Sequence, residues 1–402
     1  REQLTGLLHD ICGTLSTDTA AGRKLDVAAF DKLSSDPGLY LAQDALKDKL
    51  VDKLAYLDQE IDELEKVGAY DASRNTFRQV SLVSYAQKLA DERDAAANSP
   101  FASDNHIAVV YAEGEIVDGQ SGDQTVGGDE LAETLRTLRE NPDVKAVVLR
   151  VNSPGGSAMA SELIQREMRD LLDAKIPVVV SMGTYAASGG YWISAYSNYI
   201  YAEPTTVTGS IGVFGLKLNF QDIANQHGLT FDSVNTVPNA DMDSIVRPWT
   251  PDEQQLAQKM VDYLYDQFIT KVAQGRKLNP DAVREIAQGR VWSGTAALEK
   301  DKGLVNALGG LQDAIAKAVD LAGLKGKPYV LLQYPEVHPQ LEELVQELAS
   351  NGAPAPVSKL SPALQHDPVS AALKQLGAQW QLLRSFNDPH GMYARLPYML
   401  QF

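Results

Sequence analysis

One serine lies among small residues in the segment TYAASGGYWIS, residues 184–194. Two alanines precede Ser188, two glycines follow it, and the strand-like run IPVVVSMG stands before the segment. Small neighbours give a hydroxyl room and let another backbone come close to it, which suits a nucleophile at the head of a helix. The same composition suits tight packing of a helix on a sheet, so this segment alone leaves both interpretations open.

A second segment, VNSPGGS (151–157), ends in a Pro-Gly-Gly turn. Its backbone amides open the next helix, and exposed amides at a helix start favour negative charge. Gly155 is therefore predicted to donate its N–H to a carbonyl oxygen that gains charge during attack, as part of an oxyanion hole. Pro-Gly-Gly is also simply a common turn. The occurrence of Ser188 after the following strand is what favours the chemical interpretation.

Neither segment contains a histidine that could serve as the base. The six histidines all lie elsewhere: His9, His106, His227, His338, His366 and His390. Their spacing does not exclude a Ser-His-Asp triad, but the G-x-S-x-G elbow is absent because Ala186 occupies its first position. A metal site has less support, since the sequence has no H-E-x-x-H motif and no Cys/His cluster.

The composition is that of an ordinary globular protein with room for two domains: 402 residues, 44% hydrophobic and 22% charged. A formal charge of -17 argues against a nucleic-acid partner, because phosphate contacts need a basic surface. Cys12 is the only cysteine, so the fold cannot rest on intrachain disulfides. No run approaches the ~20 apolar residues that a bilayer requires. The chain begins with Arg1 and not Met, which leaves a preceding anchor or export signal open.

Strands and helices alternate between residues 106 and 204. The predicted strands are HIAVVYAEGEIV (106–117, with a turn), VKAVVLRVNS (144–153), IPVVVSM (176–182) and NYIYAEP (198–204), and the predicted helices are GGDELAETLRTLRENP (127–142) and ASELIQREMRDLLDA (160–174). This alternation predicts an α/β fold with βαβ units and a mainly parallel sheet. Ligands of such sheets bind beyond the carboxyl ends of the strands, where NSPGGS and AASGG both fall.

The segments KLVDKLAYLDQEI (49–61) and GLVNALGGLQDAI (303–315) match at an offset of 254 residues. Two ordinary amphipathic helices could look alike, but the match favours a tandem repeat. A unit of that length would have begun before Arg1, so we expect only the tail of the first copy to be present. The expected domains are 1–95, the remainder of a first unit; 96–105, a linker; 106–325, a complete second unit; and 326–402, a C-terminal extension with a Pro/Ala/Ser-rich linker at 351–362.

Four segments, in this order, resemble a known family: VLRVNSPGGSAMASE, PVVVSMGTYAASGGYWIS, TVTGSIGVFG and IAQGRVWSGTAALEKDKGLVNALGG. Together they look like the signal peptide peptidase A (protease IV) family of serine peptidases. The resemblance covers residues 106–325 closely, and the N-terminal segment and the FNDPHGMYARLP tail resemble its long, two-unit bacterial form. It implies the Clp protease/crotonase type of fold and a Ser-Lys dyad. It assigns Ser188 as nucleophile, Gly155 as oxyanion donor and Ser210, in TGSIG, as the hydroxyl that orients the lysine.

The lysine is where the chain departs from the pattern. In the short members it follows the serine, at a position that Ala240 occupies here. In the long members the serine lies in the second unit and the lysine in the first, and shifting Ala240 back by the repeat offset gives a position before Arg1. The general base is therefore expected upstream of this chain. We interpret Lys145, Lys175 and Lys217 as solvated charges.

The sequence thus predicts a serine endopeptidase that cleaves extended apolar peptides, by resemblance the remnants of cleaved signal peptides. The resemblance also implies a homotetramer on the periplasmic face of the bacterial inner membrane, attached through a segment missing from this chain, with no cofactor. One alternative is a crotonase-like acyl-CoA enzyme, whose acid or base is usually a carboxylate, although Asp and Glu are absent from residues 182–202. The other is a catalytically inactive peptide-binding fragment, which the missing lysine keeps open.

Overall fold

The computed structural model describes most of the chain, in two compact units: Leu8–Ala102, and Arg1–Leu7 together with Ser103–Phe402. The described residues are 1–35, 40–72, 76–80, 84–85, 88–89, 92, 103–122, 124–235, 237–299, 301–335 and 392–395. The predicted linker at 351–362 and most of the one at 96–105 lie outside these residues. The predicted domain boundaries therefore stay predictions.

The smaller unit is mainly helical where it is described. Its elements are α1 (Glu2–Arg23, which begins in the larger unit), α2 (Val27–Ser35), α3 (Ala42–Lys47), α4 (Leu57–Gly68), β1 (Tyr70–Asp71) and β2 (Thr76–Phe77). The two short strands pair antiparallel with each other. Among the described helices of the whole chain, none combines the length and the apolar composition needed to cross a membrane.

In the larger unit, the described residues form a mainly parallel sheet of eight strands, called here the main sheet. Its strands are β3 (His106–Glu113), β6 (Val144–Ser153), β8 (Val178–Ala187), β9 (Tyr199–Ala202), β10 (Val207–Gly209), β12 (Val291–Ser293), β13 (Ala307–Leu308) and β14 (Val330–Tyr334). The order is β12-β10-β8-β6-β3-β14, with β9 and β13 branching from β8, and only β12 pairs antiparallel. The α/β class with a mainly parallel sheet is confirmed.

A second, smaller sheet lies at the carboxyl end of the main sheet. It consists of β4 (Glu115–Val117), β5 (Thr125–Gly127), β7 (Gly155–Ser157), β11 (Phe214–Gly215) and β15 (Met392–Arg395), in the order β11-β15-β7-β4-β5. Because β4 follows β3 and β7 follows β6 in the chain, this sheet continues the carboxyl edge where ligands of parallel sheets bind.

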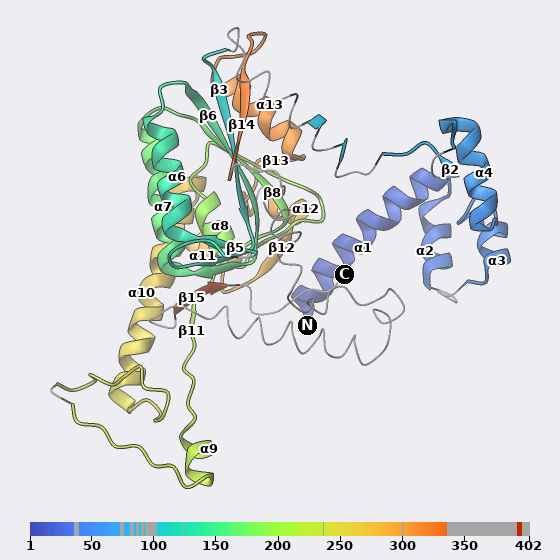
Figure 1. Ribbon diagram of the computed structural model, residues 1–402. Coiled ribbons are helices and arrows are strands. Elements are labelled where there is room, and N and C mark those ends of the chain that lie inside the picture. The colour runs from blue at the N-terminus through green and yellow to red at the C-terminus, as the bar shows by residue number, and fades with distance from the viewer. Residues whose placement is uncertain are drawn as a thin grey trace. The chain divides into compact units, whose positions relative to one another are not determined.

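Helices cover both faces of the main sheet (Figure 1). The described helices of this unit are α6 (Gly128–Glu140), α7 (Ala158–Asp173), α8 (Gly189–Ser194), α9 (Gln221–Gln226), α10 (Pro251–Arg276), α11 (Pro280–Ile286), α12 (Gly294–Leu298) and α13 (Leu311–Leu321), of which α9 lies away from the sheet. One core packs α6, α7, α8 and α10 on one face, and a second packs α13 on the other. The predicted strand 144–153 matches β6, and the predicted helices 127–142 and 160–174 contain or overlap α6 and α7.

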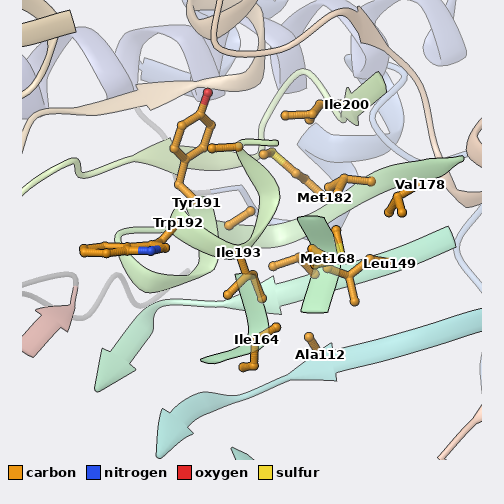
Figure 2. Packing of buried hydrophobic residues seen from close by; sticks show 14 of the residues in the cluster. Ala112, Leu149, Ile164, Met168, Val178, Met182, Tyr191, Trp192, Ile193 and Ile200 are labelled. Carbon is orange, nitrogen blue, oxygen red and sulfur yellow. The ribbon is translucent and has the colours of Figure 1, made fainter. Parts of the chain in front are cut away.

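Helix α7 illustrates why the elements form where they do. Ser157 caps its N-terminus by accepting the Ala160 N–H at 3.2 Å. Ile164 and Met168 follow at helical spacing and are fully buried. Figure 2 shows Met168 beside Leu149 of β6 and Ile164 near Ile193 of α8. The helix is therefore held between the small sheet at its start and the main sheet along its length.

The two segments of the proposed repeat fold alike at their helix starts. Helix α4 begins at Leu57 and helix α13 at Leu311, which are 254 residues apart. The Tyr56 N–H donates to the Gln59 side chain at 2.9 Å, and at the same offset the Gly310 N–H donates to Asp313, also at 2.9 Å. This agreement supports the repeat, while the division into tandem units stays a prediction.

Two ion pairs of Arg247 stabilise the junction at which the segment that follows β11 joins the start of α10. Helix α9 lies at the far end of this segment (Figure 1). Arg247 contacts Asp241 and Glu253, each at 2.6 Å. Its hydrogen bonds are the main reason why the pKa of Glu253 falls to about 2 and why that of Asp241 is also lowered. Both carboxylates must stay ionised to hold this junction.

We expect this junction to weaken in acid. A carboxylate whose pKa is depressed by folding stabilises the folded state above its unfolded pKa, about 4.3 for Glu, and that stability is lost as the pH falls toward the folded value. The melting temperature should therefore drop between about pH 4 and pH 2, and Arg247→Gln should make that drop smaller. Thermal unfolding followed by circular dichroism measures both proteins. An equal drop in the variant would show that Arg247 does not carry the effect.

Candidate active site

Ser188 stands at the junction of β8 and α8 in a strained backbone conformation, with φ 54° and ψ -115°. Residues other than glycine rarely adopt such a positive φ, and when they do the strain is concentrated at functional sites. A strained strand-to-helix turn is also how a nucleophilic serine is presented above a parallel sheet. The Ser188 N–H donates to the Gly209 carbonyl at 2.8 Å, which ties the turn to β10.

Ser210 lies beside Ser188. Strand β10 runs parallel to β8 with Gly209 opposite Ala187, so the two serines occupy equivalent positions after neighbouring strands. Ser210 also has a positive φ of 48°, and its N–H donates to the Arg290 carbonyl at 2.7 Å. The structure thus brings together the predicted nucleophile and the hydroxyl predicted to orient the base.

Gly155 lies on the other side of Ser188. Ser153, at the end of β6, is opposite Ala186 of β8 in the sheet register, which brings the Pro-Gly-Gly turn next to the Ser188 turn. Gly155 has a φ of 96°, and its N–H points to the Ser153 hydroxyl at 3.2 Å. The predicted oxyanion donor is therefore in place at the edge of the site, but in this structure its N–H is bonded within the turn. The assigned roles of all three residues stay predictions.

Gly190, two residues after Ser188, allows the start of α8 to lie close to the end of β6. A Cβ on Gly190 would lie 2.7 Å from the Ser153 carbonyl oxygen, a distance at which backbone must shift. The first turn of α8 can therefore lie against the end of β6 only because residue 190 has no side chain. The sequence left two interpretations of this segment open, tight packing of a helix on a sheet and presentation of a nucleophile. The structure is consistent with both.

We expect Gly190→Ala to destabilise the fold by about 1–3 kcal/mol, as overpacking does, and to displace the 153–155 turn from Ser188. Denaturant unfolding gives the free energy of unfolding. Gly13→Ala, whose Cβ meets nothing within 4 Å, is the matched control and should be neutral or stabilising. A Gly190→Ala protein as stable as the parent would mean that the close approach at Ser153 does not constrain the site.

Side chains of two other helices pack against α8, with Trp192 and Phe268 buried and Glu162 partly exposed. The Trp192 indole N–H donates to Glu162 of α7 at 3.2 Å, and Lys271 of α10 pairs with the other oxygen of Glu162 at 2.8 Å. Trp192 also stacks on Phe268, with ring centroids 4.5 Å apart. Sequence reasoning missed this network because its members come from three helices far apart in the chain. It anchors the helix that follows Ser188.

Within the described residues, no lysine or histidine hydrogen-bonds to Ser188. Lys145 donates to the Pro142 carbonyl at 2.6 Å. Lys217 donates to the Met242 and Ser244 carbonyls, both at 2.6 Å, and burial lowers its pKa. Lys271, the lysine behind α8, is held by Glu162. The Ser188 hydroxyl instead lies 3.5 Å from the Gly212 carbonyl, at the outer limit of a hydrogen bond.

A cavity of about 460 Å³ opens next to Ser210 and Gly212. Its walls are mainly apolar, with Asp262 at one side; the lining residues are Ser210, Gly212, Val213, Phe214, Val261, Asp262, Tyr265, Gln288 and Gly289. The Asp262 carboxylate accepts a hydrogen bond from Gln258 on its own helix at 2.7 Å. The space can take an apolar side chain or an entering base. Among the described residues, no cluster of His, Cys, Asp and Glu could hold a metal ion.

Comparison with known protein sequences identifies the family of the chain. The model of peptidase family S49 matches residues 170–325, which include Ser188 and Ser210. Protease 4 of Salmonella typhi is 40% identical over 367 residues, covering 91% of this chain and 57% of the relative. A putative signal peptide peptidase SppA of Enterococcus faecium is 33% identical over 249 residues, covering 61% of this chain and 71% of the relative. The chain thus spans little more than half of one relative and most of the other.

Among solved structures, a ClpP1 mutant from Listeria monocytogenes matches 57% of this chain and 99% of its own, at 15% identity and a TM-score of 0.35. The family itself is established by the sequence comparisons, because the chain covers 71% of the Enterococcus faecium relative and is 33% identical to it over the aligned residues. The chain belongs to peptidase family S49.

Proposed function

We propose that the protein is a serine endopeptidase that cleaves extended apolar peptides, of the kind left when signal peptides are removed, with Ser188 as its nucleophile. The observation that carries the proposal is the strained Ser188 turn, flanked on one side by Ser210 and on the other by the Gly155 turn. Membership of peptidase family S49 supports the peptidase class. The mainly apolar cavity beside Ser210 supports an apolar substrate.

The proposed reaction follows from these positions. The Ser188 Oγ attacks the scissile carbonyl carbon while a base takes its proton. The negative charge on the carbonyl oxygen is stabilised by the Gly155 N–H, which leaves the Ser153 hydroxyl to do so. The leaving amine takes the proton from the base, and water then hydrolyses the Ser188 ester. Each step needs a base of suitable pKa near the hydroxyl.

We propose that this base is a lysine from a segment preceding Arg1, oriented by the Ser210 hydroxyl. An ordinary lysine has a pKa near 10.4, so it must be desolvated to act at neutral pH. The cavity beside Ser210 offers an apolar surrounding of this kind. Lys145 and Lys217 are held by backbone carbonyls and Lys271 by Glu162, which favours a base from elsewhere.

A homotetramer on the periplasmic face of the inner membrane is part of the proposal. Its support in this chain is a set of exposed apolar side chains on the segment between β11 and α10: Leu218, Phe220, Ile223, Leu229 and Phe231. Exposed apolar side chains gathered on one segment are typical of a surface that contacts another copy or a membrane.

Rates of turnover on peptide and thioester substrates distinguish a peptidase from a crotonase-like enzyme. We expect the protein purified from its native host to cleave a quenched fluorescent peptide of apolar residues, and to cleave a charged peptide of equal length at least about tenfold more slowly, a difference of about 1.4 kcal/mol. Acyl-CoA thioesters should not turn over. Turnover of acyl-CoA without peptide cleavage would replace the proposal by the crotonase alternative.

A further inference from the structure

Strand β8 holds two more residues than its neighbour β6 just before it reaches the proposed nucleophile. Val151 of β6 is opposite Met182 of β8. Two residues later in β6, Ser153 is opposite Ala186, which is four residues later in β8. Residues 183–185, called here the β8 bulge, therefore lie against a single residue of β6. Because side chains alternate along a strand, the added pair of residues leaves Met182 and Ala186 in the same core.

Side chains hold the backbone of the β8 bulge where the pairing between strands is interrupted. Towards β6, the Tyr185 N–H donates to the side-chain oxygen of Asn152 at 3.2 Å. On its other side β8 changes partner at the same place, from β9 to β10. There the hydroxyl of Thr206 donates to the Gly183 carbonyl at 2.7 Å. Backbone groups without partners inside a sheet are costly, so these two bonds fix the conformation of the bulge.

The Asn152 side chain lies directly against the bulge. A Cβ on Gly183 would be 3.0 Å from the Cβ, Cγ and Oδ1 atoms of Asn152, which is closer than side chains ordinarily approach. The carbonyl of Asn152 also accepts the Gly114 N–H at 3.0 Å, which ties the turn after β3 to the same residue. Asn152 thus connects three neighbouring parts of the sheet at its carboxyl edge.

These contacts place Asn152 between the two groups that are proposed to react. In the chain it precedes Ser153, whose hydroxyl accepts the Gly155 N–H at 3.2 Å. Through its side chain it holds Tyr185, which stands three residues before Ser188. A nucleophile and an oxyanion donor must keep their relative positions to within about 0.5 Å to work together. A change in the β8 bulge would alter that spacing.

We propose that Asn152 is a positioning residue: its side-chain oxygen sets the β8 bulge, and thereby the spacing between the Ser188 hydroxyl and the Gly155 N–H. Asn152 acts through the backbone of Tyr185 and not by contact with the substrate. The inference rests on the proposed function, because it takes Ser188 as nucleophile and Gly155 as oxyanion donor.

Two substitutions of Asn152 separate its acceptor oxygen from its other properties. Asn152→Ala removes the acceptor of the Tyr185 N–H, whereas Asn152→Asp keeps one. In the protein purified from its native host, we expect Asn152→Ala to lower kcat for an apolar peptide by about 10²-fold, as a misplacement of about 1 Å does. KM should change little, because the affected contacts form in the transition state. Asn152→Asp should restore kcat to near the parent value.

Asn198→Ala is the matched control. The side-chain oxygen of Asn198 accepts the Val178 N–H at 2.7 Å, so it makes the same kind of bond to the first residue of the same strand. Its loss should lower the melting temperature and leave kcat unchanged, because Val178 lies at the opposite end of β8 from the site. Equal kcat values in folded Asn152→Ala and Asn198→Ala proteins would overturn the inference. If Asn152→Ala does not fold, an unchanged kcat in Gly183→Ala, whose Cβ would press on the Asn152 amide, would overturn it instead.

Hydrogen exchange followed by mass spectrometry tests the bulge without turnover. Fragments that cover residues 183–188 should exchange faster in Asn152→Ala than in the parent, and at the parent rate in Asn152→Asp. Unchanged exchange in Asn152→Ala would show that Asn152 does not hold the bulge. If Ser188→Ala cleaves peptides as fast as the parent, the proposed function fails and this inference fails with it. A loss of cleavage in Ser188→Ala with none in Asn152→Ala overturns this inference alone.

Discussion

Ser188→Ala is expected to abolish peptide cleavage while leaving the fold intact. The substitution removes the Oγ atom that would form the acyl-enzyme, and loss of a catalytic serine leaves only the background catalysis of the binding site. Among the residues that the structure describes, the side chain makes one long hydrogen bond, to the Gly212 carbonyl at 3.5 Å, so we expect its loss to lower the stability little. Replacement of the strained serine by alanine keeps the same backbone restriction at φ 54°. Initial rates on an apolar peptide and thermal unfolding measure the two effects.

Ser194→Ala is the matched control. Ser194 is also buried on α8, and its hydroxyl donates to the Gly190 carbonyl at 2.7 Å. Its removal should cost about 0.5–1.5 kcal/mol of stability and leave the rate near that of the parent. If the Ser188→Ala protein is folded and keeps more than about a tenth of the parent rate, the role of Ser188 as nucleophile is wrong.

The second large effect concerns the base. Residues 1–402 alone are expected to cleave peptides about 10²–10⁴ times more slowly than a polypeptide in which the lysine-bearing first unit precedes Arg1, because acid-base assistance contributes that much. The two proteins are compared at equal concentration of folded protein. The rate of the shorter one is followed over a range of concentrations, so that a lysine from a neighbouring copy would be recognised.

Three lysines provide the internal control for this comparison. Lys145→Met, Lys175→Met and Lys217→Met should leave the rate of the longer polypeptide unchanged, since Lys145 and Lys217 donate to backbone carbonyls and Lys175 is exposed after the end of α7. Equal rates for the shorter and longer proteins, lost in Ser188→Ala, would place the working base within residues 1–402. A loss of peptide cleavage in one of the three lysine variants would identify that lysine as the base.

Most of the fold around the site was predictable, because the signals are local. Periodic apolar residues and the turn residues at Pro142 and Pro154 place β6 and α6 within a residue or two. The carboxyl-edge rule for parallel sheets then brings Ser188 and the Gly155 turn together. The positive φ of Ser188 was not predictable, because residues other than glycine adopt it only when the surrounding structure imposes it.

Two features could not be found from local patterns. The Glu162–Lys271 pair joins residues 109 positions apart, and nothing in the spacing of either helix points to the other. The strand Met392–Arg395 is short, and its pairing with β7 depends on partners more than 200 residues earlier in the chain. Strand propensity reflects the partners that a segment meets, so a four-residue segment carries little signal of its own.

The central claim is that the Ser188 hydroxyl is the nucleophile, and covalent labelling tests it most directly. The protein purified from its native host is treated with a peptidyl phosphonate carrying apolar residues, digested, and mapped by mass spectrometry. The account predicts one adduct, on Ser188 within residues 184–194, with loss of peptide cleavage in proportion to labelling. An adduct on another residue that abolishes cleavage while Ser188 stays unmodified would contradict it.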